Sequence, residues 1–347
     1  NIEKKDLPLA VGWLLMSLQA GPGAYPVMIL NGSAGTGKTT ASRMLRELVD
    51  PNKVDLLTKP SISDIRVIGT NNHVLAFDNL SGISPQFSDA ICKIATGDNQ
   101  AVRQLYTTND EMTISIKKPC LMNGIDEIAK RGDLVSRSVK LPLRKIKARK
   151  TEKKVWADFM EDVPSIFGAL LDGLAWSIQA MPNIQVDDLT RMADFCRLST
   201  AASAAYGWFD GEFMKVYKSN IKNTHVDSLE SSTFASGIVR MFERESNFYG
   251  RPIKLLERLE DKCYVSEKVI RSQKWPTTSK GVVNQLDRLQ ESLEMVDIYY
   301  EKSKDRTNKT FITLDKYVKK TAEYEFEAED DDFDDSHIDL NLFKDKF

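Results

Sequence analysis

The spacing of apolar residues along this chain switches repeatedly between two patterns. Short continuous apolar runs predict buried strands, and apolar residues that recur every three or four positions predict helices. The predicted strands cover residues 27–30, 73–79 and 119–124. The predicted helices cover residues 7–20, 38–49 and 84–96, and residues 61–68 fit either a helix or a strand. Strands that alternate with helices predict an α/β fold with a parallel sheet.

The later part of the chain has other patterns. Residues 101–106 and 112–116 alternate as a hairpin does, after the turn that begins at Gly97. Helical spacing dominates afterwards, in residues 152–181, 189–205, 227–245, 253–261 and 279–293. Two more strands, 296–300 and 310–314, are joined by a basic loop. Helices followed by a hairpin with a basic tip predict a winged helix, a module that binds DNA or contacts proteins.

A glycine-rich motif follows the first strand. Residues 32–39 read GSAGTGKT, which is the G-x-x-x-x-G-K-T phosphate-binding loop between a strand and a helix. Its backbone N–H groups and the helix N-terminus attract phosphate. We expect Lys38 to reach the β- and γ-phosphates and Thr39 to bind Mg²⁺. The expected nucleotide-binding residues are Gly32, Ser33, Ala34, Gly35, Thr36, Gly37, Lys38, Thr39 and Thr40.

Polar residues end the next two strands. Asp78 ends one strand. Phosphate-loop ATPases bind the Mg²⁺ ion and its water ligands with an acidic residue at this place, so we expect Thr39 and Asp78 to form the metal site. The next residue, Asn79, can orient a water molecule but cannot take its proton, which leaves Asp89 and Glu111 as weak candidates for the base. If the strands are neighbours, Asn123 lies beside Asp78 and polarises the attacking water.

Two arginines follow at Arg131 and Arg137. Each is poorly placed to reach its own phosphate loop, but either can act as an arginine finger on a neighbouring subunit. A surface salt bridge is the alternative for each arginine taken alone.

Charge is unevenly distributed over the 347 residues. Residues 321–347 hold eleven acidic and two basic residues, whereas residues 1–320 hold 46 basic and 39 acidic ones. A basic body is compatible with nucleic-acid contact. We expect a solvated acidic tail, with a DNA mimic that docks through Phe343 and Phe347 as the alternative.

Cysteine and apolar content narrow the class of protein. The four cysteines are scattered without a C-x-x-C pair, which argues against a metal centre or a disulfide framework. No apolar run approaches the length that spans a membrane, so we expect a cytoplasmic protein. The sequence starts at Asn1 without an initiator Met, so we expect a fragment of a longer polypeptide.

The order of these motifs resembles the AAA+ ATPases. Five segments are similar to helicase-type ATPases of phages, plasmids and other mobile elements. They are NGSAGTGKTT, VLAFDNLSGI, KIATGDNQAVRQLYT, LMNGIDEIAKRGDLVSRS and LTRMADFCRL. Those proteins are related to superfamily 3 and minichromosome-maintenance helicases. The resemblance implies a three-layer parallel-sheet core over residues 1–150 and a helical lid over 151–226, which we expect to be followed by the winged helix over 227–320 and the acidic tail over 321–347.

The same resemblance implies roles for single residues. Asn123 becomes sensor 1, Arg137 the more favoured finger ahead of Arg131, and Arg191 a sensor 2 that touches the γ-phosphate. The hairpin grips DNA through Arg103. Further DNA-binding residues are expected on the hairpin and the winged helix, namely Lys117, Lys118, Lys280, Arg288, Lys304 and Arg306.

The expected function is an ATP- and Mg²⁺-dependent DNA helicase of a mobile element. The resemblance implies a homo-oligomer, usually a hexameric ring, that acts on single-stranded and forked DNA, with a primase or a single-strand-binding protein as further partners. One alternative is a helicase loader or replication initiator that remodels DNA without processive unwinding. A phosphate-loop regulatory switch or small-molecule kinase is the alternative from another class.

Overall fold

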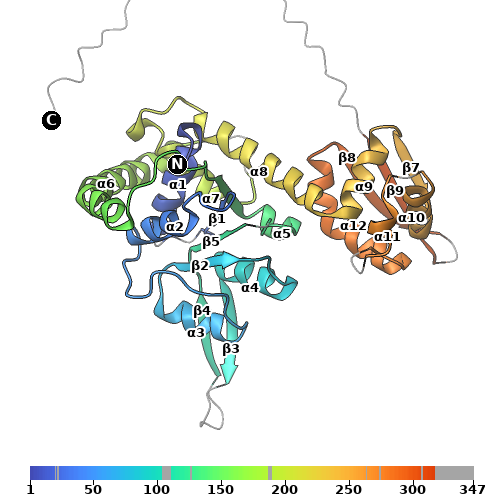
Figure 1. The fold of residues 1–347 in the computed structure, drawn as a ribbon, viewed down its shortest axis with the longest axis horizontal. Helices are drawn as coiled ribbons and strands as arrows, with labels where there is room; N and C mark the ends of the chain where they lie inside the picture. Colours follow the sequence, from blue (N-terminus) through green and yellow to red (C-terminus); the bar gives the residue numbers. More distant parts are fainter. Residues whose placement is uncertain are drawn as a thin grey trace, which may run out of the picture. The chain divides into compact units, whose positions relative to one another are not determined.

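A computed structural model describes most of the chain (Figure 1). The described residues are 1–19, 21, 23–103, 111–125, 127–186, 190–262, 264–272, 275–305 and 308–316, with only the backbone described for 66, 98–103 and 111–115. Residues 1–316 form one compact unit. The predicted acidic tail lies outside the described residues.

A four-stranded parallel sheet lies at the centre of the N-terminal half. Its strands are β1 (Val27–Asn31), β2 (Leu75–Leu80), β5 (Cys120–Gly124) and β6 (Ser138–Pro142). The strand order is β2-β5-β1-β6, and every neighbouring pair is parallel. This confirms an α/β fold with a parallel sheet, and it confirms that the strands ending near Asp78 and Asn123 are neighbours.

Helices bury both faces of this sheet. They are α1 (Leu7–Leu18), α2 (Lys38–Glu47), α3 (Asp64–Asn71), α4 (Pro85–Thr96) and α5 (Gly132–Val135). Alternate residues of a strand point to opposite faces: Met28 and Leu30 join a core formed with α1, whereas Val27 and Ile29 join a core formed with α4. Burial on both faces explains why the strands read as continuous apolar runs.

The predicted hairpin is confirmed in its backbone, but its first strand begins at Asp98, within the predicted turn. Strands β3 (Asp98–Arg103) and β4 (Glu111–Ile116) pair in antiparallel register. The segment between them lies outside the described residues, and so does the side chain of Arg103. At the base of the hairpin, Lys117 Nζ donates to the carbonyls of Gly21 at 2.6 Å and Gly23 at 3.0 Å.

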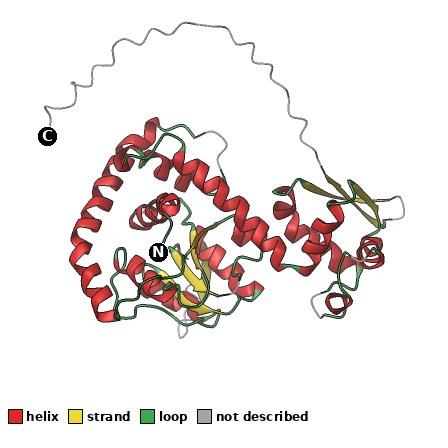
Figure 2. Ribbon diagram, turned by 45° about the horizontal axis from the view of Figure 1, so that its top comes forward, coloured by secondary structure: helices red, strands yellow, loops and turns green. Residues whose placement is uncertain are grey.

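Three further helices follow the sheet: α6 (Glu152–Ala180), α7 (Ala193–Ala201) and α8 (Glu212–Ser231). Short 3-10 turns are η1 (Lys4–Asp6), η2 (Met181–Asn183) and η3 (Ala204–Tyr206). The predicted helix over 227–245 is wrong in its bounds, because α8 runs unbroken through residue 227 (Figures 1 and 2). Ser232 then starts a new helix, its side chain accepting a hydrogen bond from the N–H of Ala235.

The C-terminal half has its own apolar core. Its helices are α9 (Thr233–Phe242), α10 (Pro252–Asp261), α11 (Glu267–Ile270) and α12 (Ser279–Glu294). Its strands are β7 (Asn247–Gly250), β8 (Ile298–Lys304) and β9 (Thr310–Lys316), in the antiparallel order β7-β9-β8. The predicted helix 279–293 and the final hairpin are thus confirmed, and β7 was not expected.

Helix α8 contacts both halves of the described unit. It packs against β6 and against α12. His225 of α8 shares a hydrogen bond of 2.8 Å with the hydroxyl of Ser292 in α12, and burial lowers the pKa of His225 to about 4. The imidazole is therefore neutral at pH 7 and belongs to the packing. Among the described helices, none combines the length and apolar character that a membrane crossing needs.

Candidate functional site

The phosphate loop lies where β1 ends and α2 begins. Gly37 precedes Lys38 with φ of 75°, and Gly35 turns the loop with φ of 78°. These left-handed conformations favour glycine. The hydroxyl of Thr36 donates to the carbonyl of Ser33 at 2.9 Å, which fixes the turn from inside. The motif therefore folds with the local geometry that its glycines predict.

Lys38 lies against the loop itself. Its ammonium group donates to the carbonyl of Gly32 at 2.6 Å and to that of Ser33 at 3.1 Å. The positive charge is thereby held at the turn that phosphate would contact. Thr40 follows on α2 and is half-buried.

A network of polar side chains lies beside the loop, at the carboxyl ends of β2 and β5. Asp78 Oδ1 accepts a hydrogen bond from Thr39 Oγ1 at 3.0 Å and another from Asn123 Nδ2 at 2.7 Å. Asn123 Nδ2 also contacts the buried hydroxyl of Ser42 at 2.8 Å. Residues from α2, β2 and β5, far apart in sequence, thus converge on one carboxylate.

Asn79 adopts an unusual backbone conformation next to this carboxylate. Its φ is 54°, which asparagine tolerates better than most residues. The strand register shifts there between Phe77 and Leu80. The N–H of Asn79 donates to Asn123 Oδ1 at 3.0 Å, and its side chain is exposed. Asn123 therefore links the backbone of one strand to the carboxylate of Asp78.

The donor set fits a hard divalent cation bound together with phosphate. A carboxylate and a hydroxyl are the oxygen ligands that Mg²⁺ takes in nucleotide sites, where phosphate and water supply the rest. Thr39 and Asp78 would hold the ion, which would neutralise phosphate charge. For the base, the structure offers little: Asp89 pairs with Arg131 at 2.9 Å, and the side chain of Glu111 lies outside the description.

Both candidate finger arginines pair with acidic residues outside the phosphate loop. The carbonyl of Arg137 accepts from the N–H of Val27, at the amino end of β1, whereas the loop starts after Asn31 at the other end. That strand separates them by about 13 Å of backbone. Arg137 is 14% exposed and paired with Asp133, while Arg131 is 28% exposed. Burial opposes ionisation of Asp133, yet Arg137 holds its pKa below the usual value.

Arg191 does not lie at the phosphate loop. It precedes α7 instead of belonging to its first turn. Its guanidinium pairs with Asp133 at 3.1 Å and Glu291 at 3.4 Å, and it donates to the hydroxyl of Ser136 at 3.2 Å. Because Asp133 and Ser136 precede β6 at the amino end of the sheet, the expected contact of Arg191 with the γ-phosphate in its own chain does not fit this structure.

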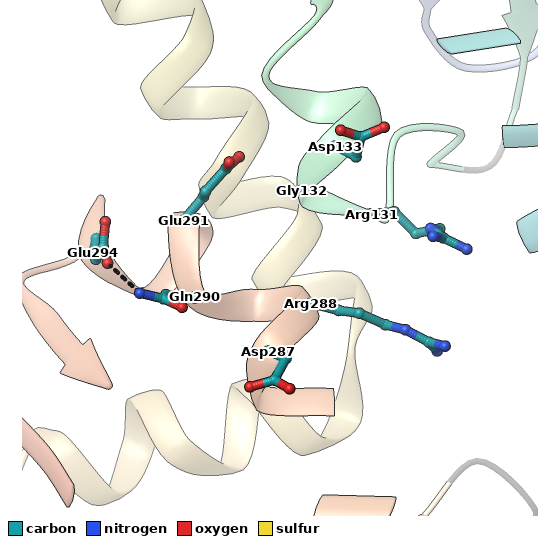
Figure 3. A pocket seen from close by; sticks show the side chains of 8 residues that line it. All are labelled: Arg131, Gly132, Asp133, Asp287, Arg288, Gln290, Glu291 and Glu294. Carbon is teal, nitrogen blue, oxygen red and sulfur yellow. Dashed lines mark hydrogen bonds between the residues drawn. The ribbon is translucent and has the colours of Figure 1, made fainter. Parts of the chain in front are cut away.

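Residues of α5 and α12, with Arg131 before α5, line a cavity of about 420 Å³. Its lining includes Arg131 and Arg288, whose side chains extend to the same side (Figure 3). Carboxylates of both helices also line it: Asp133, Asp287, Glu291 and Glu294. Arg288, a predicted DNA-binding residue, thus shares a cavity with four acidic residues that the sequence did not place beside it.

The other predicted DNA-binding residues differ in their surroundings. Lys117 ties the hairpin base to Gly21 and Gly23, and Lys118 is half-buried. Lys280 and Lys304 are exposed. Arg306 lies outside the described residues.

One element of the site was missed from the sequence. Residues 143–152, named here the strap, join β6 to α6 and contain five basic residues. The N–H of Leu143 donates to the carbonyl of Asn31 at 2.7 Å, just before the phosphate loop. Arg43 of α2, just after the loop, pairs with Glu152 at 3.0 Å. A charged run looks like an ordinary surface segment in sequence, and only these contacts place it at the loop.

Comparisons with known proteins give a family and two distant structural likenesses. A family model described as "Actinomycete integrative conjugative element replication protein" matches residues 3–225, and one described as "AICE RepA C-terminal domain" matches residues 234–327. Among curated proteins, none matches this chain.

Two solved structures are similar at 11% identity each. One is titled "SCCmec type IV Cch - active helicase", with a TM-score of 0.46 over 90% of this chain and 67% of that chain. The other is the NrS-1 C-terminal region, with a TM-score of 0.36 over 89% of this chain and 71% of that chain. At these scores neither likeness establishes the fold.

Proposed function

Because the chain belongs to the replication proteins of actinomycete integrative conjugative elements, we propose that it is an ATP-dependent DNA helicase that helps to replicate such an element. One observation carries this proposal: Thr39, Asp78 and Asn123 are joined by hydrogen bonds beside a glycine-rich loop that holds Lys38. Phosphoryl transfer needs mainly positioning and charge stabilisation, and this network supplies both.

In the proposed reaction, ATP binds to residues 32–39 through backbone N–H groups and Lys38. Thr39 and Asp78 would hold Mg²⁺, which would neutralise charge at the phosphates. Asn123 Nδ2 donates to Asp78 and Oδ1 accepts from the N–H of Asn79, so the buried amide is held in one orientation beside Asp78. This rigidity supports a role for Asn123 in orienting water, and the base stays unassigned.

We propose that a neighbouring copy completes the site with an arginine. Arg137 lies at the amino end of the sheet, away from its own loop, and Arg131 pairs with Asp89 of α4, which supports action of one of the two in trans within an AAA+ ring. The greater exposure of Arg131 favours it over Arg137, the reverse of the order expected from the sequence. A hexamer remains the expected ring.

DNA contact is proposed for the β3–β4 hairpin and for the C-terminal half. The order α9, β7, α10, α11, α12, β8, β9 with sheet order β7-β9-β8 supports a winged helix. Lys280 and Lys304 are its exposed basic candidates. Contacts to phosphates would position the protein without reading sequence and would weaken steeply with salt.

Unwinding of a forked DNA duplex tests this function. With Mg²⁺ and ATP, the full chain is expected to separate the strands, and the Lys38→Ala variant is expected to leave them paired. The readout is strand separation on a gel, with ATP hydrolysis measured in the same tubes. If the full chain hydrolyses ATP and leaves every duplex intact, the helicase proposal fails and a loader or initiator is favoured.

A further inference from the structure

The strap lies across the phosphate loop along its whole length. Its residues contact three glycine positions of the loop, as shown by where a Cβ atom on each glycine would lie. The carbonyl of Leu143 is 3.0 Å from that position on Gly32, Ile146 Cδ1 is 3.1 Å from it on Gly37, and Arg149 Nη2 is 2.8 Å from it on Gly35. The strap therefore covers the loop at both ends and at its turn.

The two ends of the strap are anchored to residues that flank the loop. The N–H of Leu143 is hydrogen-bonded to the carbonyl of Asn31, and Glu152 forms an ion pair with Arg43 of α2, the helix that follows the loop. The first residue of the chain adds to this anchor: Asn1 Nδ2 donates to the carbonyl of Thr36, and the carbonyl of Asn1 accepts from the N–H of Arg144 at 2.9 Å. The position of the strap over the loop is thus fixed at several points.

Arg149 differs from other basic residues of the strap. Arg144 pairs with Glu3 at 2.7 Å, and Lys150 pairs with Asp158 at 2.8 Å. Within the described part of the chain, Arg149 has no ion-pair partner, and its guanidinium lies against the turn at Gly35. Lys38 holds the carbonyls of Gly32 and Ser33 in the same turn. Two cations therefore approach one four-residue turn built to hold phosphate.

We infer that Arg149 binds the terminal phosphate of ATP in its own subunit. This inference rests on the proposed function, since it needs a nucleotide at the loop. A guanidinium presents several N–H donors in a fork that matches phosphate oxygens. Arg149 supplies the contact within one chain that Arg191 does not make. Because the terminal phosphate is absent from ADP, Arg149 makes the strap discriminate between nucleoside triphosphate and diphosphate.

Nucleotide affinity of full-length variants tests this role. We compare wild type, Arg149→Ala and Lys147→Ala for binding of a non-hydrolysable ATP analogue with Mg²⁺ and of ADP with Mg²⁺. Lys147 is the matched control, because it is an exposed cation of the same strap. Arg149→Ala is expected to weaken the ATP analogue by at least about tenfold and ADP by less than about threefold, since a charged hydrogen bond is lost only with the triphosphate. Lys147→Ala is expected to change neither affinity by more than about twofold.

Three results would overturn the inference. If wild type binds the ATP analogue normally and Arg149→Ala binds it as tightly as Lys147→Ala, Arg149 does not contact the terminal phosphate. The proposed function then stays intact. An equal loss for ADP and the ATP analogue assigns Arg149 to the inner phosphates or to the shape of the loop. Failure of wild type to bind either nucleotide removes the proposed function and Arg149 with it. Because Arg149 is exposed, the variants are expected to unfold at the wild-type temperature.

Discussion

Replacing Asp78 with asparagine is expected to lower Mg²⁺-dependent ATP hydrolysis by at least about 100-fold, because the ion loses its only charged protein ligand in the proposed site. An asparagine oxygen can still accept hydrogen bonds from Thr39 and Asn123, so the local fold is expected to persist. The measurement is steady-state hydrolysis over a series of Mg²⁺ concentrations, with ADP affinity measured without Mg²⁺.

Asp162→Asn is the matched control for this variant. Asp162 is an exposed aspartate on α6, so the same chemical change there is expected to leave hydrolysis within about twofold of wild type. If Asp78→Asn hydrolyses ATP at the wild-type rate with the same Mg²⁺ requirement, Asp78 is not a metal ligand and the site must be reassigned.

Arg46→Met is expected to destabilise the fold by about 3–5 kcal/mol, because it removes a buried guanidinium and leaves two backbone carbonyls and the half-buried carboxylate of Asp50 without their donor. Arg46 is 2% exposed and donates to the carbonyls of Val54 at 2.6 Å and Asp55 at 2.7 Å. It also pairs with Asp50, whose carboxylate accepts the N–H groups ahead of β2. The measurement is the free energy of unfolding from urea denaturation.

Arg43→Met provides the comparison for stability. Arg43 lies on the same helix, but its side chain is 36% exposed and its ion pairs are at the surface. Surface pairs contribute about 1 kcal/mol or less. A loss of similar, small size for both variants would contradict the structural role assigned to Arg46.

Local patterns in the sequence were enough to predict the centre of the candidate site. Strands β1, β2 and β5 are continuous apolar runs, and the glycine motif fixes the loop between β1 and α2. The pairing of β2 with β5 then brings Asp78 and Asn123 together, as expected. These features depend on residues close in sequence or on the simple rule that parallel strands end at one edge.

The features that were missed depend on contacts between distant residues. Strand β6 contains Lys140, which reads as a surface residue, but its ammonium is buried against Glu127 and Asp227. Helix α8 was not expected as one element, because its apolar residues face several different neighbours. The resemblance to AAA+ ATPases implied that Arg191 touches the γ-phosphate, yet Asp133 and Glu291 hold it elsewhere. The strap is recognisable only from its contacts with the loop.

The central claim is that ATP is hydrolysed at an interface between two subunits. The most direct test measures ATP hydrolysis by mixtures of two inactive variants. Lys38→Ala removes the phosphate-loop cation, and Arg131→Ala, with Arg137→Ala in parallel, removes the candidate arginine of the neighbour. Each variant alone is expected to be inactive, and mixing Lys38→Ala with the correct arginine variant is expected to restore hydrolysis, because some seams then combine an intact loop with an intact arginine. Wild-type activity in Lys38→Ala alone, or mixtures as inactive as their components, would contradict the account.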